Sequence, residues 1–204
     1  GRCAQPLVPL RRNGADPTQP RSGLVGKSRA IDAAREAAQL AAKSRRDVLI
    51  TGEDGVGKET LARLIHAAAG EDRAAFVPVN CAALPTNLAQ SELFGHARGQ
   101  VARDYPGLFR AAAGGTLFLR EITSLSPEVQ AQLVRVLDER SVRPVSGTSD
   151  VPVDVRVVAA TSRDLDGVIA RGELRGDLLA KFRSSTIHLA PLRERTDDIE
   201  PLVE

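Results

Sequence analysis

Residues 52–60 have the types and spacing of a phosphate-binding loop: Gly52, Glu53, Asp54, Gly55, Val56, Gly57, Lys58, Glu59 and Thr60. The glycines permit backbone conformations that aim several N–H groups at one anion. Lys58 adds a positive charge for terminal phosphates, and a helix that follows such a loop points its positive end at them. Glu59 stands where most such loops place a Ser or Thr that holds magnesium. The loop therefore predicts a phosphate site and leaves hydrolysis open.

The elements that must position this loop alternate between strands and helices. Short apolar runs predict strands at 47–51, 76–79, 116–119, 151–160 and 186–189. Helices are expected at 31–42 after a Ser28 cap, at 61–69, and at 127–139 after a Ser126 cap. Pro78 marks the second strand as an edge strand or a strand end. This order predicts an α/β fold with a mainly parallel five-stranded sheet and helices on both faces.

Composition excludes several classes of protein. Hydrophobic residues make up 42% of the chain but aromatics only 3%, so the core is expected to consist of Ala, Val, Leu and Ile. A formal net charge of +2 does not argue for nucleic acid. Cys3 and Cys81 have no metal or redox spacing, and no signal peptide or long apolar run is present. These features predict a cytoplasmic protein without membrane contact.

Several segments, taken in order, resemble the AAA+ ATPase domain of the sigma-54-dependent bacterial transcription activators (enhancer-binding proteins). They lie at residues 52–59, 76–85, 91–96, 114–119, 155–161 and 191–195. The resemblance covers roughly 23–204 and implies an AAA+ P-loop three-layer sandwich that binds ATP or ADP. It implies a nucleotide-binding domain at 23–190 and, at 191–204, the start of a helical lid that is otherwise absent from this chain. Before this domain, the Pro and Gly residues among polar residues predict a linker or arm at 1–22. Glu59 is normal within this family.

The resemblance also implies roles for individual residues. Glu121 occupies the position of the catalytic base, and Asn80 that of the Asn that contacts and restrains it. Arg175 aligns with the first of two arginine fingers that reach a neighbouring subunit's nucleotide. Lys181 replaces the second finger, and Ser162 replaces an Asn that senses the terminal phosphate. Lysine keeps the charge of a finger but loses its planar grip.

Arg120 is the sharpest departure from the family, which has Asp at this position. A guanidinium cannot ligate magnesium, so whether Mg2+ binds stays open. Arg120 could neutralise phosphate directly, turn to solvent while water fills the metal shell, or pair with Glu121. The residues after His96, at 97–106, also lack the aromatic and threonine of the family's sigma-contact loop. Contact with sigma-54 in the family's way is therefore not expected.

These departures favour a nucleotide-binding regulatory module of a bacterial transcription regulator with weak or absent hydrolysis. The expected partners are a second copy of the domain and the transcription machinery, with DNA bound only through a domain outside this chain. One alternative is a working ATPase that remodels another target, with Glu59 or Asp54 taking the magnesium role. Another is a scaffold that binds no nucleotide. His66, His96 and Cys81 are expected to be packing or surface residues rather than ligands.

Overall fold

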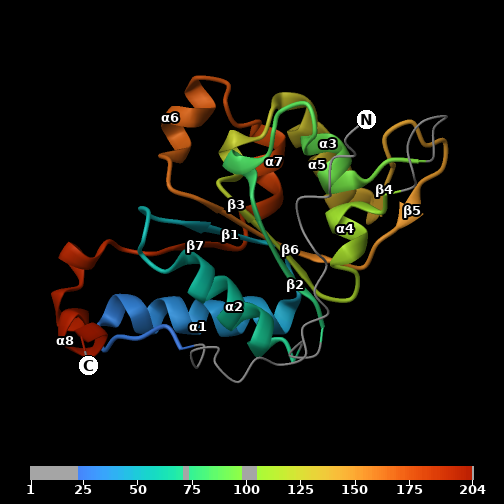
Figure 1. Cartoon of the computed structure of the whole chain (residues 1–204). Coiled ribbons are helices and arrows are strands. Elements are labelled where there is room, and N and C mark those ends of the chain that lie inside the picture. The colour runs from blue at the N-terminus through green and yellow to red at the C-terminus, as the bar shows by residue number, and fades with distance from the viewer. Residues whose placement is uncertain (1–22, 71–73, 98–104, 204) are drawn as a thin grey trace, which may run out of the picture.

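The chain folds around a parallel five-stranded sheet (Figure 1) in the computed structural model, which describes residues 23–70, 74–97 and 105–203. The strand order is β2-β3-β6-β1-β7. The strands are β1 (Val48–Thr51), β2 (Phe76–Asn80), β3 (Thr116–Arg120), β6 (Arg156–Thr161) and β7 (Thr186–His188). Pro78 lies in β2 at the edge of the sheet, where its missing N–H removes no ladder bond to a further strand. The expected sheet and its edge strand are confirmed.

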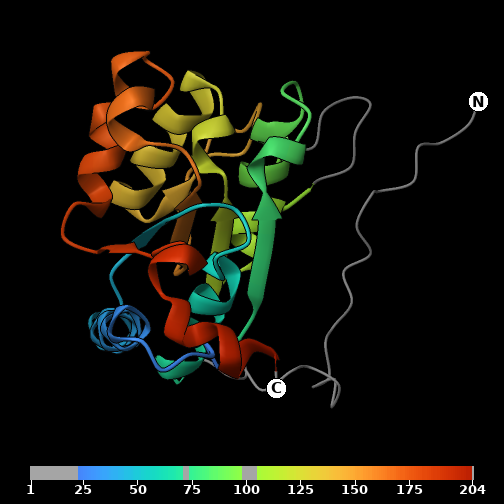
Figure 2. The same ribbon diagram turned by 90° about the vertical axis from the view of Figure 1, so that its left-hand side faces the viewer.

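Helices cover both faces of the sheet and complete a three-layer sandwich (Figures 1 and 2). One face carries α1 (Arg29–Ser44) and α2 (Lys58–Ala68), which enclose an apolar cluster that includes Ile31, Leu61 and Ile65. The other face carries α3 (Ala89–Phe94), α4 (Gly107–Ala111), α5 (Pro127–Glu139), α6 (Leu165–Ala170) and α7 (Gly176–Phe182). The two clusters bury mostly aliphatic side chains, as the composition predicts. The architecture is the expected AAA+ P-loop fold.

The predicted helix caps are present. Ser28 Oγ accepts a hydrogen bond from the backbone N–H of Ile31, which satisfies one free donor of the first turn of α1. Ser126 caps α5 in the same way through the N–H of Val129, and Pro127 follows it. The helix after the phosphate loop begins already at Lys58 rather than at residue 61, because Gly57 is its N-cap.

The single strand predicted at 151–160 is wrong. Val151–Pro152 forms β5, which pairs antiparallel with β4 (Ser141–Val142) in a separate two-stranded sheet, and β6 begins only at Arg156. Between β5 and β6, the carbonyl of Asp154 accepts a hydrogen bond from the N–H of Gly114. The chain therefore leaves the two-stranded sheet before it enters the five-stranded sheet. Val153 and Val155 remain buried, which is why the apolar pattern runs through the break unchanged.

The two ends of the described chain meet at one buried carboxylate. Asp198 belongs to the 3-10 turn η4 (Thr196–Asp198), which leads into α8 (Ile199–Val203) beside the start of α1 (Figure 1). Its side chain has no exposed surface and accepts hydrogen bonds of 2.7 Å from the N–H of Lys27 and from the N–H and hydroxyl of Ser28. Arg195 lies 3.6 Å from the same carboxylate.

The arm expected at 1–22 lies outside the described residues, and a domain boundary at residue 190 stays a prediction. Among the helices that the structure describes, none has the length and apolar character needed to cross a membrane.

Candidate nucleotide site

The loop predicted from the glycine spacing connects β1 to α2 at the carboxyl end of the sheet. Gly52 has φ 149°, and a Cβ there would lie 2.5 Å from the carbonyl oxygen of Leu189. Gly57 has φ 106° and caps α2, in a region that side-chain-bearing residues rarely adopt. The Gly52 N–H binds the carbonyl of Thr161 at the end of β6. Both glycines are therefore required by the path of the backbone.

Lys58, the first residue of α2, reaches back into the loop. Its ammonium donates to the carbonyl oxygens of Gly52 at 2.8 Å and Glu53 at 3.0 Å. It lies 3.4 Å from a carboxylate oxygen of Asp54, and only 9% of its surface is exposed. The charge is thus held inside the loop, next to the positive end of an 11-residue helix, in the place where an anion would be bound.

A cavity of about 580 Å³ opens on the loop. It is lined by Gly23, Leu24, Val25, Glu53, Asp54, Gly55, Val56, Gly57, Thr60, Pro191, Leu192, Arg193, Arg195 and Leu202. One wall is the phosphate loop, and the other is formed by apolar side chains from both ends of the described chain. A cavity with a phosphate-binding rim and an apolar wall suits a nucleotide, whose base is flat and whose phosphates are charged.

Arg193 and Glu53 bridge this cavity from opposite sides. The guanidinium of Arg193, in the turn η3 (Leu192–Glu194), donates to the two carboxylate oxygens of Glu53 at 2.8 and 2.6 Å. The hydrogen bonds from Arg193 lower the pKa of Glu53. This contact joins the phosphate loop to the first turn of the expected lid.

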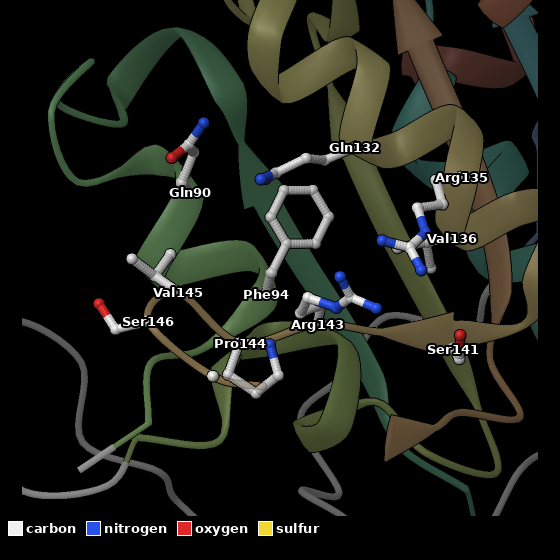
Figure 3. A pocket seen from close by; sticks show the side chains of 11 residues that line it. Gln90, Phe94, Gln132, Arg135, Val136, Ser141, Arg143, Pro144, Val145 and Ser146 are labelled. Carbon is white, nitrogen blue, oxygen red and sulfur yellow. The ribbon is translucent and has the colours of Figure 1, made fainter. Parts of the chain in front are cut away.

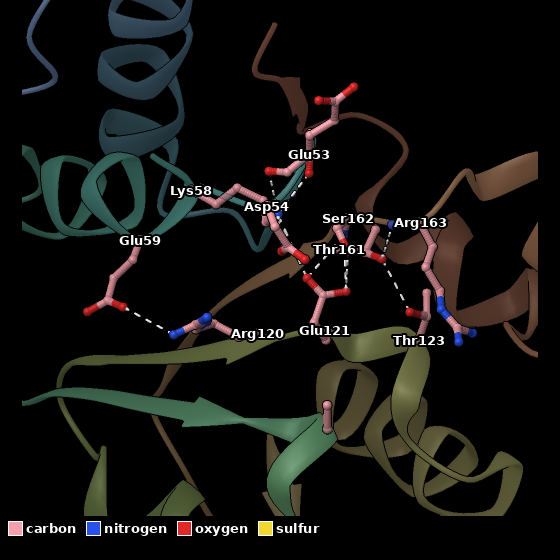
Figure 4. A network of polar contacts seen from close by, with 12 residues as sticks. Glu53, Asp54, Lys58, Glu59, Arg120, Glu121, Thr123, Thr161, Ser162 and Arg163 are labelled. Atoms are coloured by element: carbon pink, nitrogen blue, oxygen red, sulfur yellow. Dashed lines mark hydrogen bonds and ion pairs between the residues drawn. The ribbon is translucent and has the colours of Figure 1, made fainter. Parts of the chain in front are cut away.

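Glu121 and Ser162 form the other half of the polar network, across the ends of β3 and β6 (Figure 4). Ser162 donates to the Glu121 carboxylate through its backbone N–H and its hydroxyl, each at 3.1 Å. Glu121 itself has φ 51° and ψ 55°, a left-handed conformation that costs a non-glycine residue about 1 kcal/mol. The predicted base and the predicted sensor are thus brought together.

Arg120 pairs with Glu59 and not with Glu121. Its guanidinium lies 3.8 Å from Glu59 (Figure 4). The other carboxylate oxygen of Glu59 accepts hydrogen bonds from Arg63 at 2.8 and 3.2 Å. Pairing between Arg120 and Glu121, one of the alternatives left open by the sequence, is therefore wrong. Residues 120 and 121 diverge because Glu121 turns into the left-handed region directly after the strand.

Asn80 does not make the contact that its position implies. Its amide oxygen accepts the N–H of Ala82 at 3.2 Å and caps the 3-10 turn η1 (Cys81–Ala83). The neighbouring Cys81 is buried, and burial together with the negative charge of Glu121 raises the pKa of this thiol to about 12. Cys81 is thus the packed thiol that was expected.

Of the two candidate fingers, Arg175 is the N-cap of α7 and Lys181 lies within that helix, and neither lines the cavity. The guanidinium of Arg175 donates two hydrogen bonds to the carboxylate of Asp177, at 3.0 and 2.7 Å, and this pairing lowers the pKa of Asp177. Lys181 donates to Asp138 on α5 at 2.5 Å. Any contact with nucleotide would have to be made on another copy of the domain, so their roles remain predictions.

The remaining polar candidates pack within the fold. His66 is buried, lies 2.9 Å from the hydroxyl of Thr116 and meets the ring of Phe76 edge-on. His96 exchanges backbone hydrogen bonds with Tyr105. Most of the segment compared with the sigma-contact loop, residues 98–104, lies outside the described residues.

A second cavity of about 280 Å³ lies between α3, α5 and the segment after β4 (Figure 3). Phe94 forms its apolar side, while Arg135 and Arg143 at its rim both bind Asp150. No residue of the phosphate loop lines it, so it belongs to a different part of the molecule.

Sequence reasoning missed the bridging and lining residues outside the loop, notably Arg193 and Arg195. Arg195 is buried and donates to the carbonyls of Val56 at 2.9 Å and Ala190 at 3.0 Å. The segment 191–195 resembles the family, and its two arginines are the sequence signal for contacts with the loop.

Comparison with known proteins defines the class to which this fold and site belong. Residues 24–188 match the sigma-54 interaction domain, and the chain belongs to that family. It is 47% identical to the hydrogenase transcriptional regulatory protein HoxA of Cupriavidus necator, over 84% of this chain and 36% of that protein. It is 44% identical to the transcriptional regulatory protein GlrR of Escherichia coli, over 88% of this chain and 41% of that protein. The chain therefore spans well under half the length of these relatives.

Solved structures agree with this assignment. The fold matches NtrX from Brucella abortus in complex with ADP with a TM-score of 0.81 at 35% identity, covering 88% of this chain and 40% of that one. The same protein in complex with ATP gives a TM-score of 0.82 at 35% identity, covering 89% and 40%. The expected membership in the AAA+ domains of sigma-54-dependent activators is confirmed.

Proposed function

We propose that this domain is a nucleotide-responsive regulatory module of a bacterial transcription regulator, which binds ATP or ADP at residues 52–60 and hydrolyses ATP slowly or not at all. The observation that carries the proposal is Lys58, held inside a glycine loop that opens onto a cavity of about 580 Å³. That NtrX is solved with ATP and with ADP supports nucleotide binding here.

The geometry around the loop supports slow turnover. ATP hydrolysis requires stabilisation of negative charge on the phosphoryl group and a carboxylate that orients water. The candidate base Glu121 is engaged by Ser162 and lies near Lys58, while the usual metal-holding Asp is replaced by Arg120. Each departure removes or diverts a group on which the reaction depends.

The partners follow from the family and from the departures. We propose a cytoplasmic protein whose domain self-associates through the face that carries Arg175 and Lys181, and which acts on the transcription machinery without the usual sigma-54 contact. DNA would be bound only through another domain. Nucleotide bound between copies would favour assembly, because a ligand stabilises the state that binds it.

The test is a titration of purified protein with a fluorescent adenine nucleotide, together with a phosphate-release assay. Lys58→Ala is expected to raise Kd about 10- to 100-fold, as for loss of charge-assisted hydrogen bonds. Lys43→Ala, which removes the same charge from an exposed position in the last turn of α1, should leave Kd unchanged. Equal affinities in the two variants would contradict the proposed site.

Phosphate release separates the proposal from its main alternative. Steady turnover near 1 per second, at the lower end for ordinary enzymes, would favour a working ATPase that remodels another target. In that case Asp54, whose side chain is 83% exposed, is the carboxylate best placed to change partner. Absence of any nucleotide binding would favour a scaffold.

A further inference from the structure

The carboxylates around the phosphate loop are all engaged with cations or hydrogen-bond donors. Glu53 binds Arg193, Asp54 lies beside Lys58, Glu59 binds Arg63 and Arg120, and Glu121 binds Ser162 and lies beside Lys58. Within the described ranges, no group of three or more His, Cys, Asp or Glu side chains could hold a metal ion.

These residues do not fit magnesium. Mg2+ takes oxygen ligands in near-octahedral geometry and is usually held by one or two carboxylates together with phosphates and water. At the end of β3, where the family has a carboxylate, this chain presents a guanidinium, which has no lone pair to offer and repels a cation. Glu59, the carboxylate that lies beside Arg120, is already shared by two arginines.

Arg120 is the looser of the two partners of Glu59. Arg63 donates two hydrogen bonds to it, at 2.8 and 3.2 Å, whereas the guanidinium of Arg120 stands 3.8 Å away. The side chain of Arg120 is also 49% exposed, on the side of the network that faces the first turn of α2 (Figure 4). Arg120 can therefore turn to a phosphate while Glu59 keeps Arg63 as its partner.

We infer that Arg120 is the resident cation of this site and that the ligand is a nucleoside di- or triphosphate without a divalent metal. The inference rests on the proposed function, because it concerns the same nucleotide. Lys58 begins α2, and Arg120 ends β3 next to Glu59 in the first turn of the same helix. Together they give the phosphates the fixed positive charge that a metal supplies elsewhere. A metal–nucleotide complex would bring a second cation against Arg120 and bind no better.

The experiment titrates the chain with a fluorescent ADP analogue in EDTA and in excess magnesium. The wild type is expected to bind at least as tightly in EDTA. Arg120→Gln should weaken binding in EDTA about tenfold, as expected for removal of one nearby charge. Arg120→Asp should bind weakly in EDTA and recover with magnesium. Arg46→Gln, the same change at an exposed position just before β1 and outside the network around Glu59, is the matched control and should behave as the wild type.

Thermal unfolding of each variant shows whether the fold is intact before the affinities are compared. Wild-type binding that is about tenfold tighter with magnesium would overturn the inference and leave the proposed function standing. Equal effects of Arg120→Gln and Arg46→Gln would also overturn it. Absence of binding in both buffers would overturn the proposed function itself, and the inference with it.

Discussion

The ammonium of Lys58 lies 3.8 Å from the carboxylate of Glu121, so the candidate phosphate ligand and the candidate base face each other across the site. Lys58 has 9% and Glu121 18% of its side chain exposed, which limits screening of this pair by water. A phosphate that binds Lys58 must either push the Glu121 side chain aside or lie next to its negative charge. The carboxylate of Glu121 is therefore expected to oppose nucleotide binding.

Replacing Glu121 with Gln is expected to tighten nucleotide binding. The change removes a negative charge next to the phosphates at constant size, and a charge about 4 Å away is worth about 1 kcal/mol even in water, or about fivefold in Kd. The measurement is the Kd of a fluorescent nucleotide. Glu36→Gln, the same change on an exposed position of α1, should have no effect. Weaker binding in Glu121→Gln would show that the carboxylate assists the ligand instead.

The Arg193–Glu53 contact is expected to slow nucleotide release. It closes the cavity between the loop and η3, and its two side chains are more than half exposed, so it adds little to folding stability. Arg193→Ala and Glu53→Gln should each raise the dissociation rate about two- to fivefold, by stopped-flow displacement of a labelled nucleotide.

A double-mutant cycle tests whether the two residues act together. The double variant should release nucleotide no faster than either single variant, because each change already breaks the contact. Multiplied effects in the double variant would mean that Arg193 and Glu53 act on the ligand separately. Tm should stay unchanged in all three.

Asp198 is expected to make folding stability depend on pH in the acid range. Burial alone raises the pKa of this carboxyl, but hydrogen bonds from Ser28 and Lys27 and the charge of Arg195 outweigh it and lower the pKa. A lowered pKa means that the contribution is complete above about pH 4, the unfolded value, and is lost as pH falls through the folded value.

Asp198→Asn should therefore cost about 2 to 3 kcal/mol at pH 7, from the loss of charge-assisted hydrogen bonds. Its stability should also fall less steeply than that of the wild type below about pH 4. Urea unfolding between pH 7 and 2 measures both effects. Asp197→Asn, an exposed neighbour in the same turn, is the control. If the unfolding free energies of the wild type and Asp198→Asn fall in parallel at acid pH, this carboxyl is not the cause of the pH dependence.

Local sequence carried most of the fold and the centre of the site. The phosphate loop is visible in the sequence because it depends on residue types at fixed spacing, those of Gly52, Gly57 and Lys58. The break before Arg156 was not visible, because Val153 and Val155 stay buried while a distant N–H, that of Gly114, takes the Asp154 carbonyl. The ion-pair partner of Arg120 also depends on tertiary geometry. Because the chain turns at Glu121, Arg120 pairs with Glu59 and not with its neighbour in sequence.

The carboxylate of Asp198, in η4 near the end of the described chain, binds Lys27 and Ser28 near its beginning. Arg195 connects it to the carbonyl of Val56 in the phosphate loop. Segments attached at either end would thus depart from one corner of the sandwich. A displacement at that corner would reach the phosphate loop through Asp198 and Arg195, by a short connection that does not pass through the sheet.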